Sequence, residues 1–155
     1  MEKNQNAAQP DTPLMISGIA DIMNRYDGYI LDVWGVLHNG LSPFQGALDV
    51  VATLHDLGKK IVLVSNSPQR ATRVQQHLES MGYNPDWFDD IITSGEHAHH
   101  MLTTRESAFH KQCGNKCYYA GTDHFFPAIE DLGLEFVEKI SEAEFTLVNN
   151  PKPDY

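Results

Sequence analysis

Cysteine and positive charge are both scarce in this sequence. The 155 residues include two cysteines, Cys113 and Cys117, which are too few for a disulfide framework or for a structural zinc site. The 11 lysines and arginines are outnumbered by 21 aspartates and glutamates, so the chain lacks the clustered positive charge that binds nucleic acids and anionic membranes. We therefore expect a cytoplasmic protein with no nucleic-acid partner and no membrane partner.

The N-terminal segment lacks an apolar core. Residues 1–12 are polar and rich in turn formers, which argues against a signal peptide or a membrane anchor and predicts a disordered tail. The rest of the chain, with 41% hydrophobic residues overall, has the size and composition of a globular domain that can bury a core.

Helical and strand-like patterns alternate along the chain. The spacing of apolar residues predicts helices over 14–26, 47–58, 71–82, 96–110 and 124–133, and strands over 29–33, 60–66, 90–95, 116–121, 134–138 and 143–150. Strands that are apolar throughout and separated by helices indicate a mostly parallel sheet that is covered on both faces. The predicted class is therefore α/β, with a doubly wound, Rossmann-like sheet.

Polar residues stand at the carboxyl ends of the first three strands, where open α/β sheets bind their ligands. Asp32 ends the first strand, Ser65 and Asn66 end the second, and Thr93 and Ser94 end the third. Asp32 alone is also typical of a turn cap. Together with Gly35 and Ser65 it favours a phosphate site, because a glycine turn exposes backbone amides and a hydroxyl can hold a phosphoryl oxygen.

The segments DVWGVLHNG (residues 32–40) and LVSNSPQR (residues 63–70) resemble motifs I and II of the haloacid dehalogenase superfamily. The closest similarity is to its class IIA, the NagD-like phosphatases, and it extends from Tyr29 to the end of the chain. The resemblance implies the first half of a core domain over 13–95, a hinge at Gly95, and a linker helix with part of an α/β cap domain over 96–155.

The resemblance also implies a reaction and its residues. Asp32 matches the nucleophile that forms an aspartyl-phosphate, and it would ligate Mg²⁺ together with the backbone carbonyl of Trp34. Ser65, with the amides around Asn66 and Ser67, matches the group that binds the transferring phosphoryl. The implied function is Mg²⁺-dependent hydrolysis of a small phosphorylated metabolite.

Two further features are candidates beside this motif set. Arg70, at the start of the following helix, is a candidate for contacting a phosphate or a substrate carboxylate, although a solvated arginine is the commoner arrangement. His97 and His100 have a spacing that can share a metal, but a solvated helix face is the favoured interpretation because no carboxylate or cysteine joins them.

Trp34 departs from the pattern of the resembled family. Most phosphatases of the superfamily carry a second aspartate at this position, which protonates the leaving group and activates water, and an indole can do neither. Turnover would then be slow, restricted to good leaving groups, or dependent on another acid such as His38. The alternative function is a non-catalytic phosphate-binding or regulatory module. A receiver-like domain fits less well, because such domains are phosphorylated on a later strand.

The motif III lysine and the motif IV acidic pair of the family have no clear match here. Lys152 has no helix after it, and Asp89 and Asp90 precede their strand, which places them at the opposite edge of the sheet. We therefore expect a truncated, N-terminal portion of such a hydrolase. The strand that leads to Asp32 would then be an exposed edge, which favours pairing with a second copy of the chain.

Overall fold

The computed structural model describes residues 15–149, which form two small parallel sheets. The predicted tail over residues 1–12 and Lys152 lie outside the described residues. The first sheet has the order β1-β2-β3, with β1 (Gly28–Leu31), β2 (Lys60–Ser65) and β3 (Asp90–Thr93). The second has the order β5-β4-β6, with β4 (Lys116–Gly121), β5 (Glu135–Phe136) and β6 (Phe145–Asn149). The predicted α/β class with parallel strands is confirmed.

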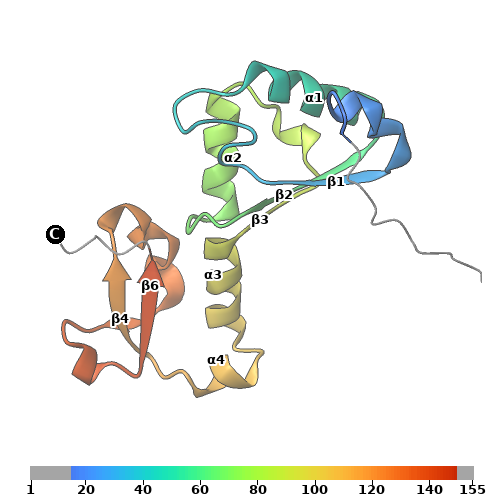
Figure 1. Ribbon diagram of the computed structural model, residues 1–155. Coiled ribbons are helices and arrows are strands. Elements are labelled where there is room, and N and C mark those ends of the chain that lie inside the picture. Colours follow the sequence, from blue (N-terminus) through green and yellow to red (C-terminus); the bar gives the residue numbers. More distant parts are fainter. Residues whose placement is uncertain (1–14, 150–155) are drawn as a thin grey trace, which may run out of the picture.

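Helices cover one face of the first sheet. Helix α1 (Gln45–Asp56) and helix α2 (Ala71–Ser80) lie on the same side of it in Figure 1. Their buried residues Leu54 and Leu78 pack with Ile61 and Leu63 of β2, which are fully buried. Alternate residues of the strands point away from this core, as the pleat of a strand requires.

The opposite face of the first sheet is open. Its side chains include Ile30, which is 77% exposed, together with Val64 and Ile92, which are 41% and 46% exposed. The predicted second layer of helices is therefore not present within residues 15–149, and the sheet is a partial Rossmann-like core. Within the described residues β1 is an edge strand of this sheet, as expected.

A helix leads from the first sheet to the second. Helix α3 (Ser94–Thr104) begins directly after β3 and runs alongside the second sheet, and the chain passes through α4 (Ala108–Gln112) before it enters β4 (Figure 1). Arg105 adopts a left-handed conformation with φ 53° and separates the two, so the single helix predicted over 96–110 is wrong. The predicted boundary at residue 95 falls in the first turn of α3, and the division into core and cap stays a prediction.

Several predicted elements are shorter in the structure. Instead of a helix over 14–26 there are two 3₁₀ turns, η1 (Ile19–Asp21) and η2 (Met23–Arg25). The segment 124–133 forms η4 (Asp123–Ala128) and η5 (Glu130–Leu132), because Pro127 cannot donate the hydrogen bond that an α-helix needs. The remaining 3₁₀ turns are η3 (Pro85–Trp87) and η6 (Ile140–Glu142). Within residues 15–149, no helix has both the length and the apolar character needed to span a membrane.

The one-sided core predicts unequal effects of truncating two strand residues. Leu63→Ala removes a fully buried side chain and should lower the free energy of unfolding by about 2–5 kcal/mol. Ile30→Ala, on the open face, should change it by about 0.5 kcal/mol or less. Urea denaturation followed by circular dichroism measures both, and equal losses would contradict the open face.

Candidate active site

The first sheet brings two predicted site residues to one of its edges. Asp32 directly follows β1, and Ser65 is the last residue of β2. The parallel register pairs Leu31 with Leu63, so the chain leaves both strands at the same end of the sheet. Asp32 and Ser65 both line one cavity of about 560 Å³.

The cavity is formed by the loops after β1 and β2, by α2, and by the start of η4. Its walls consist of Asp32, Val33, Trp34, His38, Ser65, Asn66, Ser67, Pro68, Gln69, Arg73, Val74, His77, His124 and Phe125. Five of the predicted site residues therefore meet here, and two others, Gly35 and Arg70, are not among the lining residues.

The carboxylate of Asp32 is exposed to the cavity. One oxygen, Oδ1, accepts a hydrogen bond of 2.7 Å from the backbone N–H of Val33. No lysine, arginine or histidine of residues 15–149 forms an ion pair with it. A carboxylate in this state can act as a nucleophile or as a ligand for a hard cation.

Ser65 is buried at the base of the following loop, with 8% of its surface exposed. Its Oγ accepts the backbone N–H of Ser67 at 3.1 Å, and the Oγ of Ser67 in turn accepts the N–H of Gln69 at 3.3 Å. The Ser67 amide, which was predicted to bind a phosphoryl oxygen, is thus engaged inside the loop. The hydroxyl hydrogen of Ser65 has no acceptor among the described residues, so it can donate to an oxygen in the cavity.

Gly35 shapes the loop after β1 and does not line the cavity. Its φ of +82° is a left-handed conformation that glycine adopts without strain. Its N–H donates to the carbonyl of His38 at 2.8 Å. The expectation that Gly35 offers its backbone to a phosphate is therefore wrong for this conformation, because the tight turn consumes the amide.

The loop over residues 38–43, called the flap below, turns at Asn39 and Gly40. The side-chain oxygen of Asn39 accepts the backbone N–H groups of residues 41 and 42, and Gly40 has φ +94°. The Tyr83 hydroxyl anchors the base of this loop by donating to the carbonyl of Leu37 at 2.7 Å. Burial raises the pKa of Tyr83 to about 12, so the hydroxyl keeps its proton.

Trp34 projects its indole along the flap and remains 65% exposed. The ring lies against Gly40, where an added methyl group would overlap the six-membered ring, so glycine at this position allows the close contact. The indole and the His38 ring form a T-shaped pair, with a centroid distance of 5.6 Å and an angle of 73° between their planes. An aromatic surface therefore occupies the position two residues after Asp32.

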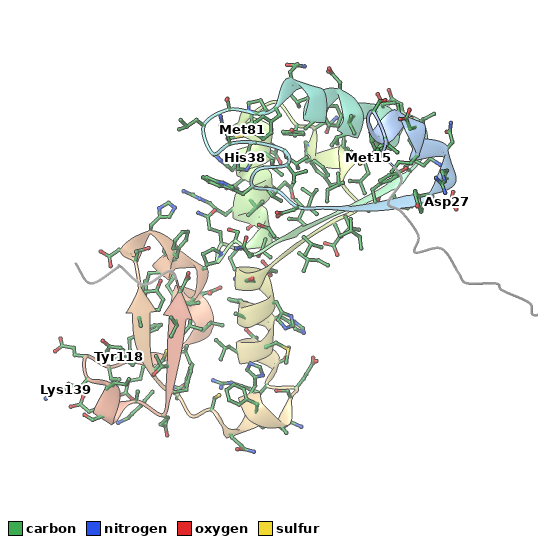
Figure 2. The ribbon with its side chains drawn as sticks, viewed as in Figure 1. Met15, Asp27, His38, Met81, Tyr118 and Lys139 are labelled. Carbon is green, nitrogen blue, oxygen red and sulfur yellow. The ribbon has the colours of Figure 1, made fainter. Side chains whose placement is uncertain are left out.

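His38, labelled in Figure 2, is buried, and its ring centroid lies 5.3 Å from that of His77 on α2. Its Nδ1 accepts the backbone N–H of Gly40 at 2.9 Å, which leaves the ring proton on Nε2. Burial first, and then the neighbouring His77, lowers the pKa of His38. A histidine held in the neutral form is a weak proton donor, so the structure argues against His38 as the replacement acid.

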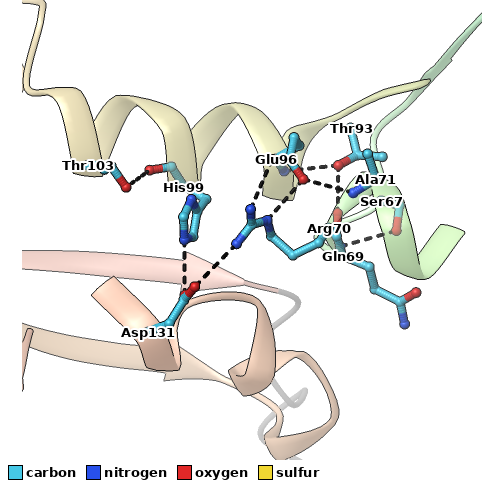
Figure 3. Close-up of polar contacts among 9 residues, drawn as sticks. All are labelled: Ser67, Gln69, Arg70, Ala71, Thr93, Glu96, His99, Thr103 and Asp131. Carbon is cyan, nitrogen blue, oxygen red and sulfur yellow. Dashed lines mark hydrogen bonds and ion pairs between the residues drawn. The ribbon is translucent and has the colours of Figure 1, made fainter. Parts of the chain in front are cut away.

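Arg70 is held in a polar network that joins α2, α3 and η5 (Figure 3). Its Nε and a terminal nitrogen donate to the two oxygens of Glu96 at 2.9 and 3.1 Å, and it lies 3.7 Å from Asp131. Asp131 is also 3.0 Å from the Nε2 of His99. The hydrogen bonds from Arg70 hold the pKa of the Glu96 carboxyl below its ordinary value. Arg70 therefore contacts neighbouring carboxylates and does not line the cavity of Asp32 and Ser65.

Arg73 and His77 line the cavity, whereas Arg70 does not. Neither of the two was predicted from the sequence to be a site residue. They lie on α2 with a spacing of four residues, which puts them on one face of the helix. This four-residue spacing, directly after the motif II segment, is the sequence feature that could have predicted their place in the cavity. His124 was also missed as a site residue, because no local pattern indicates that η4 lies against the loop after β2.

Gly95 lies where α3 meets the loop after β2. Its N–H donates to the carbonyl of Ser67 at 3.1 Å, and a methyl group added to it would overlap the carbonyl of Pro68. Thr93 supports the same contact, because its hydroxyl donates to the carbonyl of Gln69 at 2.6 Å and accepts the N–H of Glu96 at 2.9 Å. The loop that follows Ser65 is thus fixed from the side of α3.

The residues present fit a magnesium ion that keeps most of its ligands as water and phosphate. Mg²⁺ in proteins is commonly bound through one or two carboxylates with several waters retained. The unpaired carboxylate of Asp32 and the backbone carbonyl of Trp34 offer oxygen donors of this type at the cavity. Within residues 15–149 there is no group of three histidine, cysteine or acidic side chains that would enclose a metal, at His97 and His100 or elsewhere.

Comparison with known proteins gives a consistent family. The family model of the haloacid dehalogenase-like hydrolases matches residues 29–135. A 5'-nucleotidase of Bacillus subtilis is 29% identical over 115 residues, which are 74% of this chain and 42% of that protein.

Solved structures of a haloacid dehalogenase-like hydrolase and of a phosphatase have folds similar to that of this chain. A haloacid dehalogenase-like hydrolase from Brucella suis superposes with a TM-score of 0.74 at 24% identity, over 89% of this chain and 48% of that one. A p-nitrophenyl phosphatase from Archaeoglobus fulgidus superposes with a TM-score of 0.61 at 26% identity, over 83% of this chain and 47% of that one. The chain thus spans less than half the length of these relatives.

The contact of Gly95 with the loop after β2 predicts a large effect of one methyl group. Gly95→Ala should lower the free energy of unfolding by about 1–3 kcal/mol, because the added carbon overlaps a backbone carbonyl that the loop cannot easily move. Gly46→Ala is the matched control. It has no neighbour within 4 Å and should be neutral or stabilising by up to about 1 kcal/mol. If Gly95→Ala unfolds at the same urea concentration as Gly46→Ala, the close packing is refuted.

Proposed function

The chain belongs to the haloacid dehalogenase-like hydrolase family, and on that premise we propose that it provides the nucleophile half of a Mg²⁺-dependent phosphomonoester hydrolase. The observation that supports this most directly is the shared cavity of Asp32 and Ser65, in which an unpaired carboxylate and a free hydroxyl hydrogen sit at one edge of the sheet. The substrate class is a small phosphorylated metabolite.

Each of these residues has a separate role in phosphoryl transfer. Asp32 attacks phosphorus and forms an aspartyl-phosphate, which water then hydrolyses. Ser65 donates its hydroxyl hydrogen to an oxygen of the transferring phosphoryl group, with Asn66 beside it. Arg73 adds positive charge on the α2 side of the cavity.

Magnesium would be held by the Asp32 carboxylate and the Trp34 carbonyl. When bound, the ion neutralises negative charge on the phosphoryl oxygens as the nucleophile approaches. Within the described residues the cavity contains no second carboxylate, so further charge neutralisation would come from other parts of a longer protein or from another chain.

Two other properties belong to the proposal. The open face of the first sheet and its edge strand β1 favour association with a second copy of the chain. The two cysteines are free thiols, which suits a cytoplasmic location.

A second candidate function is a non-catalytic phosphate-binding or regulatory module. Trp34, exposed at the cavity in place of an acid, and His38, held as a weak proton donor, favour it. Such a module would bind phosphate through the same Ser65 loop but would not turn over.

Substitution of Asp32 distinguishes these functions. Asp32→Asn should lower the rate of Mg²⁺-dependent release of 4-nitrophenolate from 4-nitrophenyl phosphate by at least about 10³-fold, because an amide cannot form the acyl phosphate. Asp86→Asn, an exposed aspartate outside the cavity, is the control and should keep the native rate. Mass spectrometry of the quenched native reaction should find the phosphoryl group on the peptide that contains Asp32. Native activity in Asp32→Asn would contradict the enzyme hypothesis. Phosphate binding by the native protein without turnover would favour the non-catalytic module.

A further inference from the structure

The cavity holds one carboxylate, that of Asp32, within the described residues. In the proposed reaction Asp32 is the nucleophile, so it cannot also give a proton to the departing oxygen in the same step. An alcohol leaves poorly without that proton, and a positioned acid contributes about 10²–10⁴-fold to such reactions. The other titratable side chains of the cavity therefore determine which leaving groups the site accepts.

Three of these four side chains are poorly suited to donate a proton. His38 accepts a hydrogen bond at Nδ1 and is held neutral, and the guanidinium of Arg73 does not lose its proton. The Nε2 of His124 lies 3.1 Å from the side-chain amide nitrogen of Gln69, which can only donate, so this histidine nitrogen is an acceptor. His77 remains as the alternative acid and has to be tested directly.

Trp34 lies two residues after Asp32 and lines the same cavity. Its indole is 65% exposed, lies against Gly40 and is flanked by the His38 ring. The indole N–H donates hydrogen bonds but does not transfer a proton, while its face offers a flat apolar surface to a planar group. The position two residues after Asp32 therefore offers an aromatic surface and no acidic side chain.

We propose that Trp34 makes this site selective for phosphoryl donors with an acidic leaving group, namely aryl and acyl phosphates, and that the phosphoaspartate forms faster than it is hydrolysed. This inference rests on the proposed function. It concerns which donors are accepted and which step is slow, and the reaction class stays the same.

The two steps balance without a protein acid. A carboxylate oxygen of Asp32 forms a bond to phosphorus while the bond between phosphorus and the leaving oxygen breaks, and that electron pair departs on a phenolate or a carboxylate. In the second step a water oxygen attacks phosphorus, the bond to Asp32 breaks, and the electron pair returns to the carboxylate. The protons of water pass to phosphate and solvent. In the proposed reaction no side chain of the cavity is assigned to accelerate this second step, so the covalent form is expected to accumulate.

The leaving-group preference can be measured with four donors and the purified protein in Mg²⁺. The native chain should cleave 4-nitrophenyl phosphate and acetyl phosphate at least about 10²-fold faster than glycerol 3-phosphate, with phenyl phosphate between them. 4-Nitrophenolate should appear in a burst of one equivalent per protein. Trp34→Asp should raise the glycerol 3-phosphate rate by about 10²-fold, narrow the preference and remove the burst.

Two control variants separate the possible causes. Trp34→Phe keeps an aromatic ring without an acid, so it should retain the large rate difference between 4-nitrophenyl phosphate and glycerol 3-phosphate. His77→Ala should leave the same rate difference unchanged. Equal native rates for all four donors, or a preference that changes in His77→Ala, would overturn the inference and leave the proposed hydrolase intact. Failure of every donor to phosphorylate Asp32 would overturn the proposed function itself. The native preference needs no substitution, so a poorly folding Trp34→Asp protein does not remove the test.

Discussion

The parallel alignment of β1 with β2 is the constraint on which the site depends. Ile61 and Leu63 are fully buried under α1 and α2, and this burial fixes which residues of β2 face the core. A shift by one residue would turn the whole strand over, at the cost of that buried surface. Because the register is fixed in this way, Asp32 and Ser65 leave the sheet at the same edge and line one cavity.

The loops after these strands are held by contacts from elsewhere in the chain. The Tyr83 hydroxyl anchors the loop after β1 at Leu37, while Gly95 and Thr93 fix the loop after β2 from the start of α3. The ion pair of Arg70 with Asp131 and the polar contact of His99 with the same carboxylate connect this region to η5. Few of these residues touch the cavity, yet they determine the position of those that do. Because α3 begins at β3 and packs against this loop, the placement of the second sheet is coupled to the site.

The sequence predicted the parts of this arrangement that local patterns encode. Continuous apolar runs indicated β1, β2 and β3, and the polar residues at their ends identified Asp32 and Ser65 before any geometry was known. Roles that depend on distant partners were not predictable. Arg70 was a candidate for contacting a phosphate, but its partner Glu96 lies 26 positions later in the chain and only the fold shows that they meet. Gly35 was expected to expose its amide, which the tight turn instead consumes. The open face of the sheet was missed because an apolar strand looks the same whether one face or both are covered.

A bound analogue of the phosphorylated state offers the most direct measurement of the central claim, which is that Asp32 and Ser65 act on one phosphoryl group. Beryllofluoride mimics a phosphoryl group on a carboxylate, so a crystal structure of the protein with beryllofluoride and Mg²⁺ would locate that group. The account predicts beryllium bonded to an oxygen of Asp32, with one fluorine within hydrogen-bond distance of the Ser65 hydroxyl. A fluoride complex bound elsewhere, or an Asp32 carboxylate that turns away from Ser65 in its presence, would contradict the account.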